Sequence, residues 1–395
     1  MTREETFLKH QAQTTPFPYL IDVDRAEGIY IWDQSGKRYM DMIAGVAVNN
    51  IGHRHPLVIE AIQKQLDKHL HVMVYGEYIQ DSQIALAENL KSILPEQLNC
   101  SYIVNSGTEA IEAALKLAKR VTGRQQIVST RNSYHGSTHG SMSVSGNETK
   151  KANFRPLLPA VSFITFNDIE SLELITDQTA GVLIEPIQGD AGLRVPESEF
   201  LKTLRQKCFD SGALLIFDEV QVGMGRTGSM FAFEQYDVVP DILVLGKALG
   251  GGMPVGAMIS SYDNMQKFTH NPMLGHITTF GGHPVICAAS NSCINVLKSE
   301  KWINEAEAKG LLLEELIAQC ADVIEIRRKG LFFAVELGDF DKVKAVVDGC
   351  LEKGLIGFWF LSCPTAFRLS PPLCITEDEI KEAGKIILET LSDIG

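Results

Sequence analysis

A cluster of small polar residues follows an apolar stretch near residue 100. The stretch SYIV (101 to 104) is typical of a buried strand, and NSGTEA (105 to 110) leads from it directly into a helical pattern. Free backbone N–H groups at a helix N-terminus attract anions, and small side chains leave room for a phosphate. Ser and Thr also occur as ordinary helix caps, so this segment alone is a weak indication. The candidate phosphate ligands are Ser106, Gly107 and Thr108.

Acidic residues end two further apolar stretches. Glu185 follows AGVLI (180 to 184), and Asp218 with Glu219 follows ALLIF (213 to 217). A carboxylate at the mouth of a buried strand is costly unless it has a partner, because desolvation disfavours its charged form. One such acid is explained by a structural ion pair, whereas two on nearby strands indicate a cationic ligand group or a metal.

A lysine ends another apolar stretch. Lys247 follows DILVL (241 to 245) and Gly246, and the glycine-rich sequence ALGGG comes after it. Most lysines are solvated surface groups. A lysine that is partly desolvated at the end of a strand has a lowered pKa, which favours the neutral amine needed for Schiff-base chemistry.

A scaffold of parallel strands is needed to bring these residues together. From about residue 100, short apolar runs alternate with helical periodicity, and several runs are apolar throughout, as in strands covered by helices on both faces. Open α/β sheets bind ligands at the carboxyl ends of their strands. An apolar helical stripe follows the first run, at Ile111, Ala114, Leu115 and Ala118. The sequence therefore predicts an α/β protein with a mainly parallel sheet.

Different patterns flank this central region. The sequence GIYIWDQSGKRYMDM (28 to 42) alternates apolar and polar residues around a turn, which predicts a β-hairpin. Near the other end, Thr376 and Glu379 form a capping box that predicts the start of a helix. Residues beyond about 290 carry a looser pattern of helices and short strands.

A phosphate site, a strand-end carboxylate and a strand-end lysine together match the needs of pyridoxal phosphate. The lysine holds the aldehyde as an imine, and the carboxylate keeps the pyridine nitrogen protonated so that the ring can accept electrons. Asp218 and Lys247 are 29 residues apart (247 − 218), which is about one βαβ unit. Neighbouring positions on one sheet are therefore expected for these two residues.

Composition excludes several classes of protein. The 395 residues contain 36 Lys and Arg against 49 Asp and Glu, a net charge of −13, which argues against a nucleic-acid-binding protein. The eight cysteines form no C-x-x-C pair, and the histidine pairs at 53 and 55 and at 135 and 139 lack a companion acid, so no metal site is expected. We find no signal peptide and no apolar run of ~20 residues, and we expect a cytoplasmic protein without a membrane partner.

Eight ordered segments resemble the class III, ornithine- and acetylornithine-like aminotransferases of pyridoxal-phosphate fold type I. The likeness runs nearly end to end. The segments are NNIGHRHP (49 to 56), NSGTEA (105 to 110), SYHG (133 to 136), EPIQGDAG (185 to 192), DEVQVGMGRTG (218 to 228), LGKALGGGMPVGA (245 to 257), TTFGGHP (278 to 284) and RLSPPL (368 to 373). Each segment alone is weak, but eight in order make a chance likeness improbable.

The resemblance implies a fold of two domains. The large, cofactor-binding domain would contain a mainly parallel, mixed sheet of the seven-stranded type flanked by helices, and the small domain would be α+β. We expect residues 1–50 and 290–395 to form the small domain and residues 51–289 to form the large one. The resemblance also implies a homodimer with a shared active site, which transfers a terminal amino group from an acetylornithine-like or other ω-amino donor to 2-oxoglutarate.

The resemblance also assigns roles to residues. Lys247 would bind the cofactor and carry the proton, Asp218 would pair with the pyridine nitrogen, and Gln221 would reach the phenolic oxygen. Thr279 would reach the phosphate in the neighbouring subunit, and Arg368 would bind the substrate carboxylate. The expected cofactor-binding residues are Ser106, Gly107, Thr108, Tyr134, His135, Glu185, Asp218, Gln221, Lys247 and Thr279, and the expected substrate-binding residues are Arg368, Asp190, Ser137 and Thr278.

Several positions depart from the pattern of the family, among them His283, where asparagine is usual. Ser137 stands where the family commonly has an arginine that binds a substrate carboxylate. Asp190 stands where a glutamate often pairs with the C-terminal arginine, so we expect that pair to be weaker or differently placed. Val46 replaces the aromatic residue of ornithine aminotransferases, which argues against free ornithine as the donor.

Other functions remain as alternatives. A glutamate-1-semialdehyde aminomutase or a dialkylglycine decarboxylase would use the same cofactor, and a non-catalytic binding protein on this fold is prompted by Ser137. The spacing of Gly223, Gly225 and Gly228 matches a dinucleotide fingerprint, but no long amphipathic helix follows it, so we interpret these glycines as loop geometry.

Overall fold

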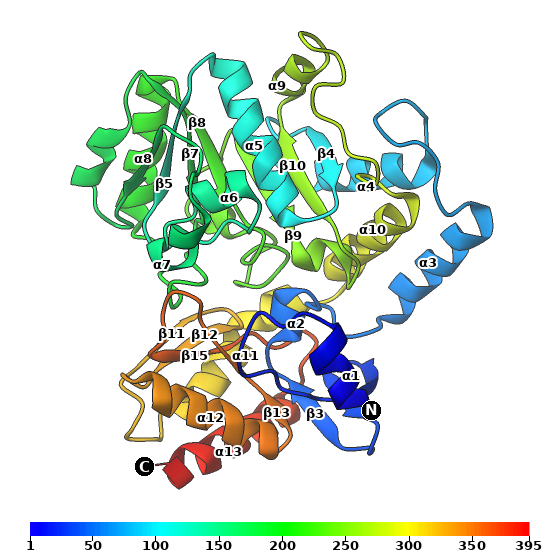
Figure 1. The fold of residues 1–395 in the computed structure, drawn as a ribbon, viewed down its shortest axis with the longest axis vertical. Helices are drawn as coiled ribbons and strands as arrows, with labels where there is room; N and C mark the ends of the chain where they lie inside the picture. The colour runs from blue at the N-terminus through cyan, green and yellow to red at the C-terminus, as the bar shows by residue number, and fades with distance from the viewer. Residues whose placement is uncertain (395) are drawn as a thin grey trace.

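A seven-stranded sheet forms the centre of the larger half of this computed structural model, which describes residues 1–394 (Figure 1). The strand order is β4-β10-β9-β8-β7-β5-β6. The strands are β4 (Cys100–Val104), β5 (Gln126–Thr130), β6 (Val161–Ile164), β7 (Thr179–Ile184), β8 (Leu214–Asp218), β9 (Ile242–Gly246) and β10 (Gly256–Ser260). Only β10 is antiparallel to its neighbours, so the predicted mainly parallel, mixed sheet is confirmed.

All five apolar runs predicted from sequence fall on strands of this sheet, namely SYIV, QIVST (126 to 130), AGVLI, ALLIF and DILVL. β7 and β9 are buried at every residue, as their continuous apolar sequence predicts. The antiparallel strand β10 was not among the predicted runs, and neither was β6. β10 lies between β4 and β9, so it brings the start of the helix after β4 close to the residues that follow β9.

Helices cover both the sheet and the second half of the molecule. α5 packs on the sheet through its predicted stripe, and α10 packs against α3 and α4. The helices are α1 (Arg3–His10), α2 (Ala44–Ala47), α3 (Pro56–Lys68), α4 (Asp81–Ser92), α5 (Gly107–Thr122), α6 (His139–Val144), α7 (Glu148–Lys151), α8 (Ser198–Ser211), α9 (Tyr262–Met265), α10 (Pro284–Ser299), α11 (Trp302–Ile317), α12 (Phe340–Glu352) and α13 (Glu377–Ile394). Short 3₁₀ turns are η1 (Ala152–Phe154), η2 (Glu170–Leu174), η3 (Ala232–Gln235), η4 (Lys247–Gly250) and η5 (Gln266–Phe268).

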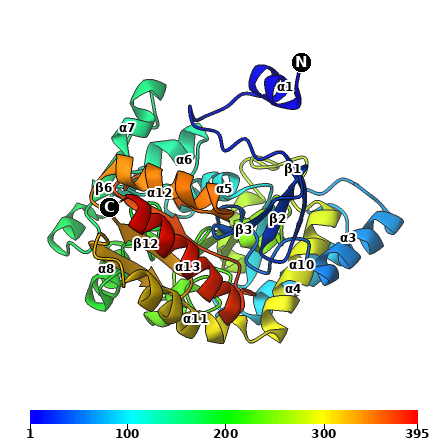
Figure 2. The same cartoon turned by 90° about the horizontal axis from the view of Figure 1, so that it is seen from below.

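Two four-stranded sheets build the smaller half. One has the order β1-β2-β3-β13 and the other β11-β12-β15-β14. Their strands are β1 (Val23–Glu27), β2 (Tyr30–Asp33), β3 (Arg38–Asp41), β11 (Glu325–Lys329), β12 (Phe332–Glu336), β13 (Leu355–Ile356), β14 (Phe358–Trp359) and β15 (Ala366–Leu369). Because β13 pairs with β3, segments from both ends of the chain share one sheet (Figures 1 and 2).

Local predictions in this half are confirmed. β2 and β3 form the predicted antiparallel hairpin. The Thr376 hydroxyl accepts a hydrogen bond from the Glu379 N–H at 3.3 Å, and the Glu379 carboxylate accepts one from the Thr376 N–H at 2.8 Å, as a capping box requires. The domain boundaries at 50/51 and 289/290 stay a prediction, since α10 continues across position 290.

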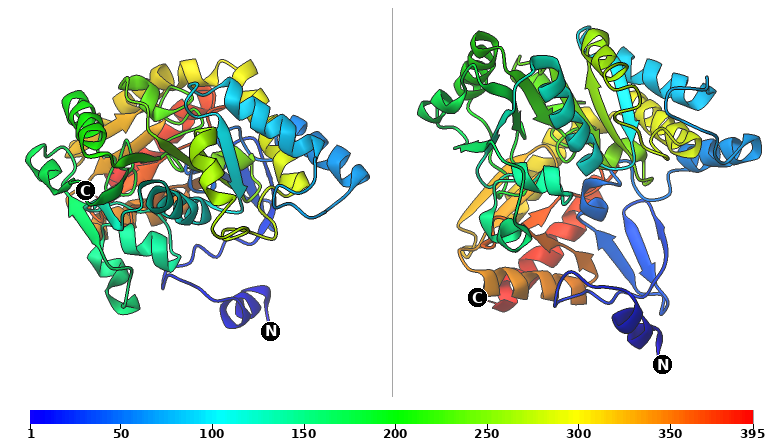
Figure 3. Two further views of the ribbon diagram at one scale, coloured as in Figure 1. Left: turned by 90° about the horizontal axis from the view of Figure 1, so that it is seen from above. Right: turned by 45° about the horizontal axis from the view of Figure 1, so that its top comes forward.

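The first helix stands apart from the rest of the chain. α1 has no buried residue, and two views show it projecting from the smaller half (Figures 2 and 3). Across residues 1–394, none of the helices combines the length and the apolar character that crossing a membrane requires. Within the same residues, no group of three or more His, Cys, Asp or Glu side chains is placed to hold a metal ion.

Candidate active site

Lys247 lies at the carboxyl end of β9, beside the start of α5. Its backbone φ is +44°, a left-handed conformation that is uncommon outside glycine and that gathers at functional sites. The residue before it must be small, because a Cβ atom on Gly246 would lie 3.3 Å from the Cα atom of Gly107. This close approach places the lysine next to the predicted phosphate site, at the edge of the sheet that faces the smaller half (Figure 1).

Four charged groups surround the Lys247 amine. Burial lowers its pKa below that of an ordinary lysine, the Asp190, Asp218 and Glu185 carboxylates oppose this shift, and the Arg368 guanidinium adds to it. The net lowering increases the fraction of neutral amine, which is the form that attacks a carbonyl group. These five residues come from distant parts of the sequence, and the fold brings them together as predicted.

Asp218, the last residue of β8, is held by a histidine. One carboxylate oxygen lies 2.7 Å from His135 Nδ1, and the other accepts a hydrogen bond from the Val220 N–H at 3.0 Å. His135 Nε2 lies 3.3 Å from the Ser129 hydroxyl, so both ring nitrogens have partners. His135 was expected to bind the cofactor. The structure places it against Asp218, where it orients the carboxylate, and its contact with the cofactor stays a prediction.

Two buried polar side chains next to this pair each have one atom without a hydrogen-bond partner. Gln221 Nε2 and Glu185 Oε2 are both unpaired within the described chain. Burial raises the pKa of Glu185 well above its usual range, and the Asp218 and Asp190 carboxylates raise it further. Unpaired buried polar atoms are costly, so their presence around Lys247 indicates that the site is built for a polar ligand.

The predicted phosphate ligands form the first turn of α5. Ser106 caps the helix by accepting a hydrogen bond from the Glu109 N–H at 3.3 Å, and α5 begins at Gly107. The Thr108 hydroxyl lies 2.8 Å from that of Thr138 and 2.6 Å from that of Ser141. The small residues at this helix N-terminus leave backbone N–H groups available to an anion.

Arg368 and Asp190 form an ion pair inside the site. Arg368 Nη1 lies 2.9 Å from Asp190 Oδ1, and the two side chains are 3% and 5% exposed. The shorter acid therefore still reaches the guanidinium, which β15 brings close to it. That the pair is weaker or differently placed than in the family stays a prediction. Burial lowers the pKa of Arg368, and the Asp190 carboxylate opposes the shift. Arg368 Nε has no partner and remains free for an oxygen ligand.

The remaining predicted substrate residues are more exposed. The Tyr134 hydroxyl lies 3.1 Å from the Ser137 hydroxyl, so the position that departs from the family is occupied by a pair of neutral hydroxyl groups. Thr278 accepts a hydrogen bond from the Asn105 side chain at 3.0 Å, near the phosphate site. Thr279 is exposed.

Sequence analysis missed the supporting contacts of the site. Nothing in the spacing of Ser129 and His135 revealed that these side chains support Asp218, and Asn105 stood out only as the first residue of the NSGTEA segment. Asn105 donates to Glu109 from both its backbone N–H and its side chain, at 2.9 Å each. A polar residue between a strand and a helix cap is the only signal that could have identified it.

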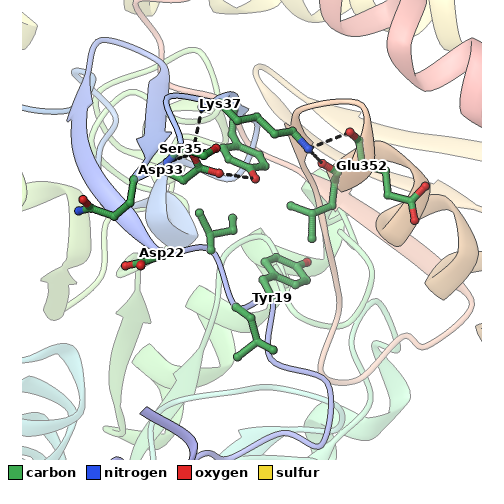
Figure 4. Close-up of a pocket in the computed structure, with 11 residues that line it drawn as sticks. Tyr19, Asp22, Asp33, Ser35, Lys37 and Glu352 are labelled. Atoms are coloured by element: carbon green, nitrogen blue, oxygen red, sulfur yellow. Dashed lines mark hydrogen bonds between the residues drawn. The ribbon is translucent and has the colours of Figure 1, made fainter. Parts of the chain in front are cut away.

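A pocket of about 400 Å³ lies elsewhere, between the N-terminal hairpin and α12 (Figure 4). Lys37 in this pocket already donates to the Glu352 carbonyl at 2.9 Å, and the Asp33 carboxylate accepts from the Lys37 and Ser35 N–H groups at 2.9 Å each. None of the predicted site residues lines it. The predicted site residues therefore lie outside this pocket.

The whole chain matches one family of enzymes. Residues 11–391 match the family model "Aminotransferase class-III", and the chain belongs to this family. It is 40% identical over 371 residues to the acetylornithine aminotransferase of Methanopyrus kandleri, covering 93% of this chain and 94% of the relative. It is 36% identical over 379 residues to the [LysW]-aminoadipate semialdehyde/glutamate semialdehyde transaminase of Sulfolobus acidocaldarius, covering 95% of each.

A solved structure has the same fold over its full length. The ornithine aminotransferase of Toxoplasma gondii superposes with a TM-score of 0.90 at 30% identity, over 99% of this chain and 94% of that one. The protein is therefore an aminotransferase that depends on pyridoxal phosphate. It acts on an amino donor and a keto acid.

The residues around Lys247 fit this cofactor. The site combines a buried amine, a carboxylate held by His135, an unpaired Gln221 amide and a helix N-terminus of small residues. When bound, the cofactor supplies an electron sink for cleavage of a bond at the substrate's amino-bearing carbon. The protein's own groups around Lys247 would bind, orient and desolvate the reacting groups.

Proposed function

We propose that this aminotransferase moves the terminal amino group of an acylated ornithine-like or other ω-amino donor to 2-oxoglutarate. The observation that carries the proposal is the buried Arg368, which faces Lys247 and has a free Nε. A guanidinium binds a carboxylate through two parallel hydrogen bonds and thereby orients the rest of the molecule. A donor or acceptor held this way places its reacting carbon toward the lysine.

The proposed roles of the remaining residues follow from their positions. Lys247 holds the cofactor and moves the proton, while Asp218 holds the pyridine nitrogen in its protonated form. Gln221 binds the phenolic oxygen, Tyr134 stacks on the ring, and the phosphate is bound at the α5 N-terminus. The proposed phosphate ligands are Ser106, Gly107 and Thr108, with Glu185 and His135 supporting the ring side and Thr278 lying beside Asn105.

Asp190 is proposed to regulate which substrate end Arg368 accepts. In the structure the Asp190 carboxylate is bound to the Arg368 guanidinium, so a substrate carboxylate must displace Asp190. An uncharged end can be accommodated without breaking the pair. The two half-reactions need both situations, because the reacting end of an ω-amino donor carries no carboxylate whereas 2-oxoglutarate does.

The donor itself is proposed from the surroundings of Ser137. Two neutral hydroxyl groups, those of Ser137 and Tyr134, provide hydrogen bonds but no positive charge. An amide or acyl group suits such a site better than a carboxylate does, because neither hydroxyl gives a carboxylate a positively charged partner. The similarity to relatives named acetylornithine aminotransferase and [LysW]-aminoadipate semialdehyde/glutamate semialdehyde transaminase supports the same substrate class.

The arginine proposal makes a quantitative prediction. Arg368→Lys keeps the charge but loses the planar pair of donors, and we expect KM for 2-oxoglutarate to rise about 30-fold or more, equivalent to ~2 kcal/mol. Steady-state kinetics with the oxo acid varied at saturating donor measures this effect.

Asp190→Asn is the matched variant. Removing the competing carboxylate is expected to lower KM for the oxo acid, opposite in direction to Arg368→Lys. If both variants change KM in the same direction, the proposal that Asp190 competes for Arg368 is wrong.

We also propose that two copies of the chain form a homodimer. Two loops, 70–80 and 272–280, meet through the rings of His71 and Phe280, whose centres are 5.2 Å apart. Large apolar side chains on these loops are exposed to solvent, at Leu70, Met73, Tyr78, Ile79, Met273, Leu274, Ile277 and Phe280. Ile79 is 90% exposed, and so much apolar surface on two adjoining loops is typical of an interface. Thr279 lies in this surface, which suits a residue that reaches the partner's phosphate.

Charge placed in this surface should separate the dimer. Ile79→Asp combined with Phe280→Asp is expected to give a monomer in sedimentation velocity at micromolar concentration, with loss of bound cofactor. Phe209→Asp is the control, because Phe209 is 74% exposed on α8, away from both loops. Should the double variant sediment as the unmodified protein does, the proposed interface lies elsewhere.

A cytoplasmic location is proposed on the state of the cysteines. All eight are free in the structure, and four of them are fully buried. Unpaired thiols suit a reducing compartment.

A further inference from the structure

A buried arginine joins the cofactor loop to the smaller half of the molecule. Arg226 is 0% exposed, and its guanidinium donates to three oxygen atoms, none of which belongs to a carboxylate. Its Nη1 donates to the carbonyl oxygens of Leu331 at 2.9 Å and Pro371 at 2.6 Å, and its Nη2 donates to the side-chain oxygen of Asn50. A single guanidinium thus binds three separate segments of the chain.

Asn50 completes this arrangement. Its side-chain N–H group donates to the Met224 carbonyl at 2.9 Å, and its backbone carbonyl accepts from the Leu373 N–H at 2.7 Å. Asn50 is 1% exposed. The side chain of Asn50 therefore holds the loop that contains Arg226, and its backbone holds the segment that follows β15.

The segments joined here carry the two binding functions of the site. Arg226 is five residues after Gln221 on the loop that begins at Asp218, which is the cofactor side. Pro371 is three residues after Arg368, which is the substrate side. The contacts of Arg226 therefore connect the loop that contains Gln221 to the segment that follows Arg368.

The energetic cost of this arginine indicates more than packing. Burial lowers the pKa of Arg226 to about 9, which shows how strongly the charged form is desolvated. An apolar residue of similar volume often serves a core equally well or better than buried charges do. A planar guanidinium, however, fixes the direction to several oxygens at once, which neither an apolar side chain nor a lysine can do.

We infer that Arg226, together with Asn50, is a positioning residue that sets the placement of Arg368 relative to Asp218 and Gln221. This inference rests on the proposed function of Arg368 as the binder of the substrate carboxylate. Arg226 does not touch substrate or cofactor. It acts through the carbonyl of Pro371 and through the backbone of the loop 218–228.

The first test separates positioning from simple stabilisation. Arg226→Lys holoenzyme is expected to keep the absorbance of its bound cofactor, while KM for 2-oxoglutarate rises about tenfold and kcat changes less, because a displacement of about 1 Å is costly to binding geometry. Phe200→Leu, a buried core change in α8, is the control for lost stability, and it should lower Tm without changing KM. Asn50→Ala provides the same test if Arg226→Lys does not fold.

A double-mutant cycle gives the decisive result. If Arg226 acts through Arg368, the variant carrying Arg226→Lys and Arg368→Lys will show a KM for 2-oxoglutarate no higher than that of Arg368→Lys alone. Fully additive effects, or loss of the cofactor with an unchanged KM, would overturn the inference. An Arg368→Lys variant with an unchanged KM would instead overturn the proposed function of Arg368, so the two failures are distinguishable.

Discussion

Replacing Lys247 with alanine is expected to abolish transamination, with kcat falling by about 10⁴-fold or more, because the covalent attachment and the proton transfer are lost together. The structure supports this expectation in two ways. Lys247 is the one lysine at the end of a strand of the large sheet within the described residues, and burial lowers the pKa of its amine toward the reactive neutral form.

The measurement is single-turnover transfer from donor to 2-oxoglutarate, followed as glutamate formed per active site. Lys202→Ala is the control, since Lys202 is exposed on α8. Circular dichroism and Tm should show that Lys247→Ala is folded. Full turnover by a folded Lys247→Ala protein would rule out the assigned role of the lysine.

Asp218→Asn is expected to have the second-largest effect, lowering kcat about 10²- to 10³-fold, as removal of a preorganised electrostatic contact in an active site does. Asparagine has nearly the same shape, but it lacks the negative charge that would hold a protonated pyridine nitrogen. The change also alters the 2.7 Å contact with His135, because an amide is neutral. The reaction should slow while the cofactor remains bound through its phosphate.

A variant of the histidine separates the two parts of this pair. His135→Asn retains a polar contact to Asp218 and leaves the carboxylate charged, so its effect on kcat should be much smaller than that of Asp218→Asn. Rapid-quench measurement of the first half-reaction compares the variants directly. Equal losses in the two variants would mean that orientation of the carboxylate, and not its charge, is the dominant contribution.

Sequence patterns were sufficient to predict the core of the site. Lys247, Asp218 and Glu185 each end an apolar run, and parallel strands bring such ends to one edge of a sheet. The helix stripe after Ser106 was equally readable, because every residue of that stripe is buried in α5. In these places local propensity and the global fold agree.

Other features depended on distances that no local pattern contains. β10 was not predicted, although it is buried at every residue. Its sequence is short, begins with glycine and follows a turn, whereas the predicted runs alternate with helical patterns. The Asp190–Arg368 pair joins residues 178 positions apart, and its formation depends on how β15 sits in the smaller half. The role inferred for Arg226 could not be predicted for the same reason, because its partners Asn50, Leu331 and Pro371 are all distant from it in the sequence.

The central claim is that the terminal amino group of the donor is transferred to 2-oxoglutarate. The most direct test uses N-acetylornithine labelled with ¹⁵N at its terminal nitrogen, with the purified holoenzyme and 2-oxoglutarate. The account predicts that the label appears in glutamate, and that without 2-oxoglutarate no more than one equivalent of semialdehyde forms per active site. Unlabelled glutamate, or repeated turnover of the donor without any oxo acid, would contradict the claim.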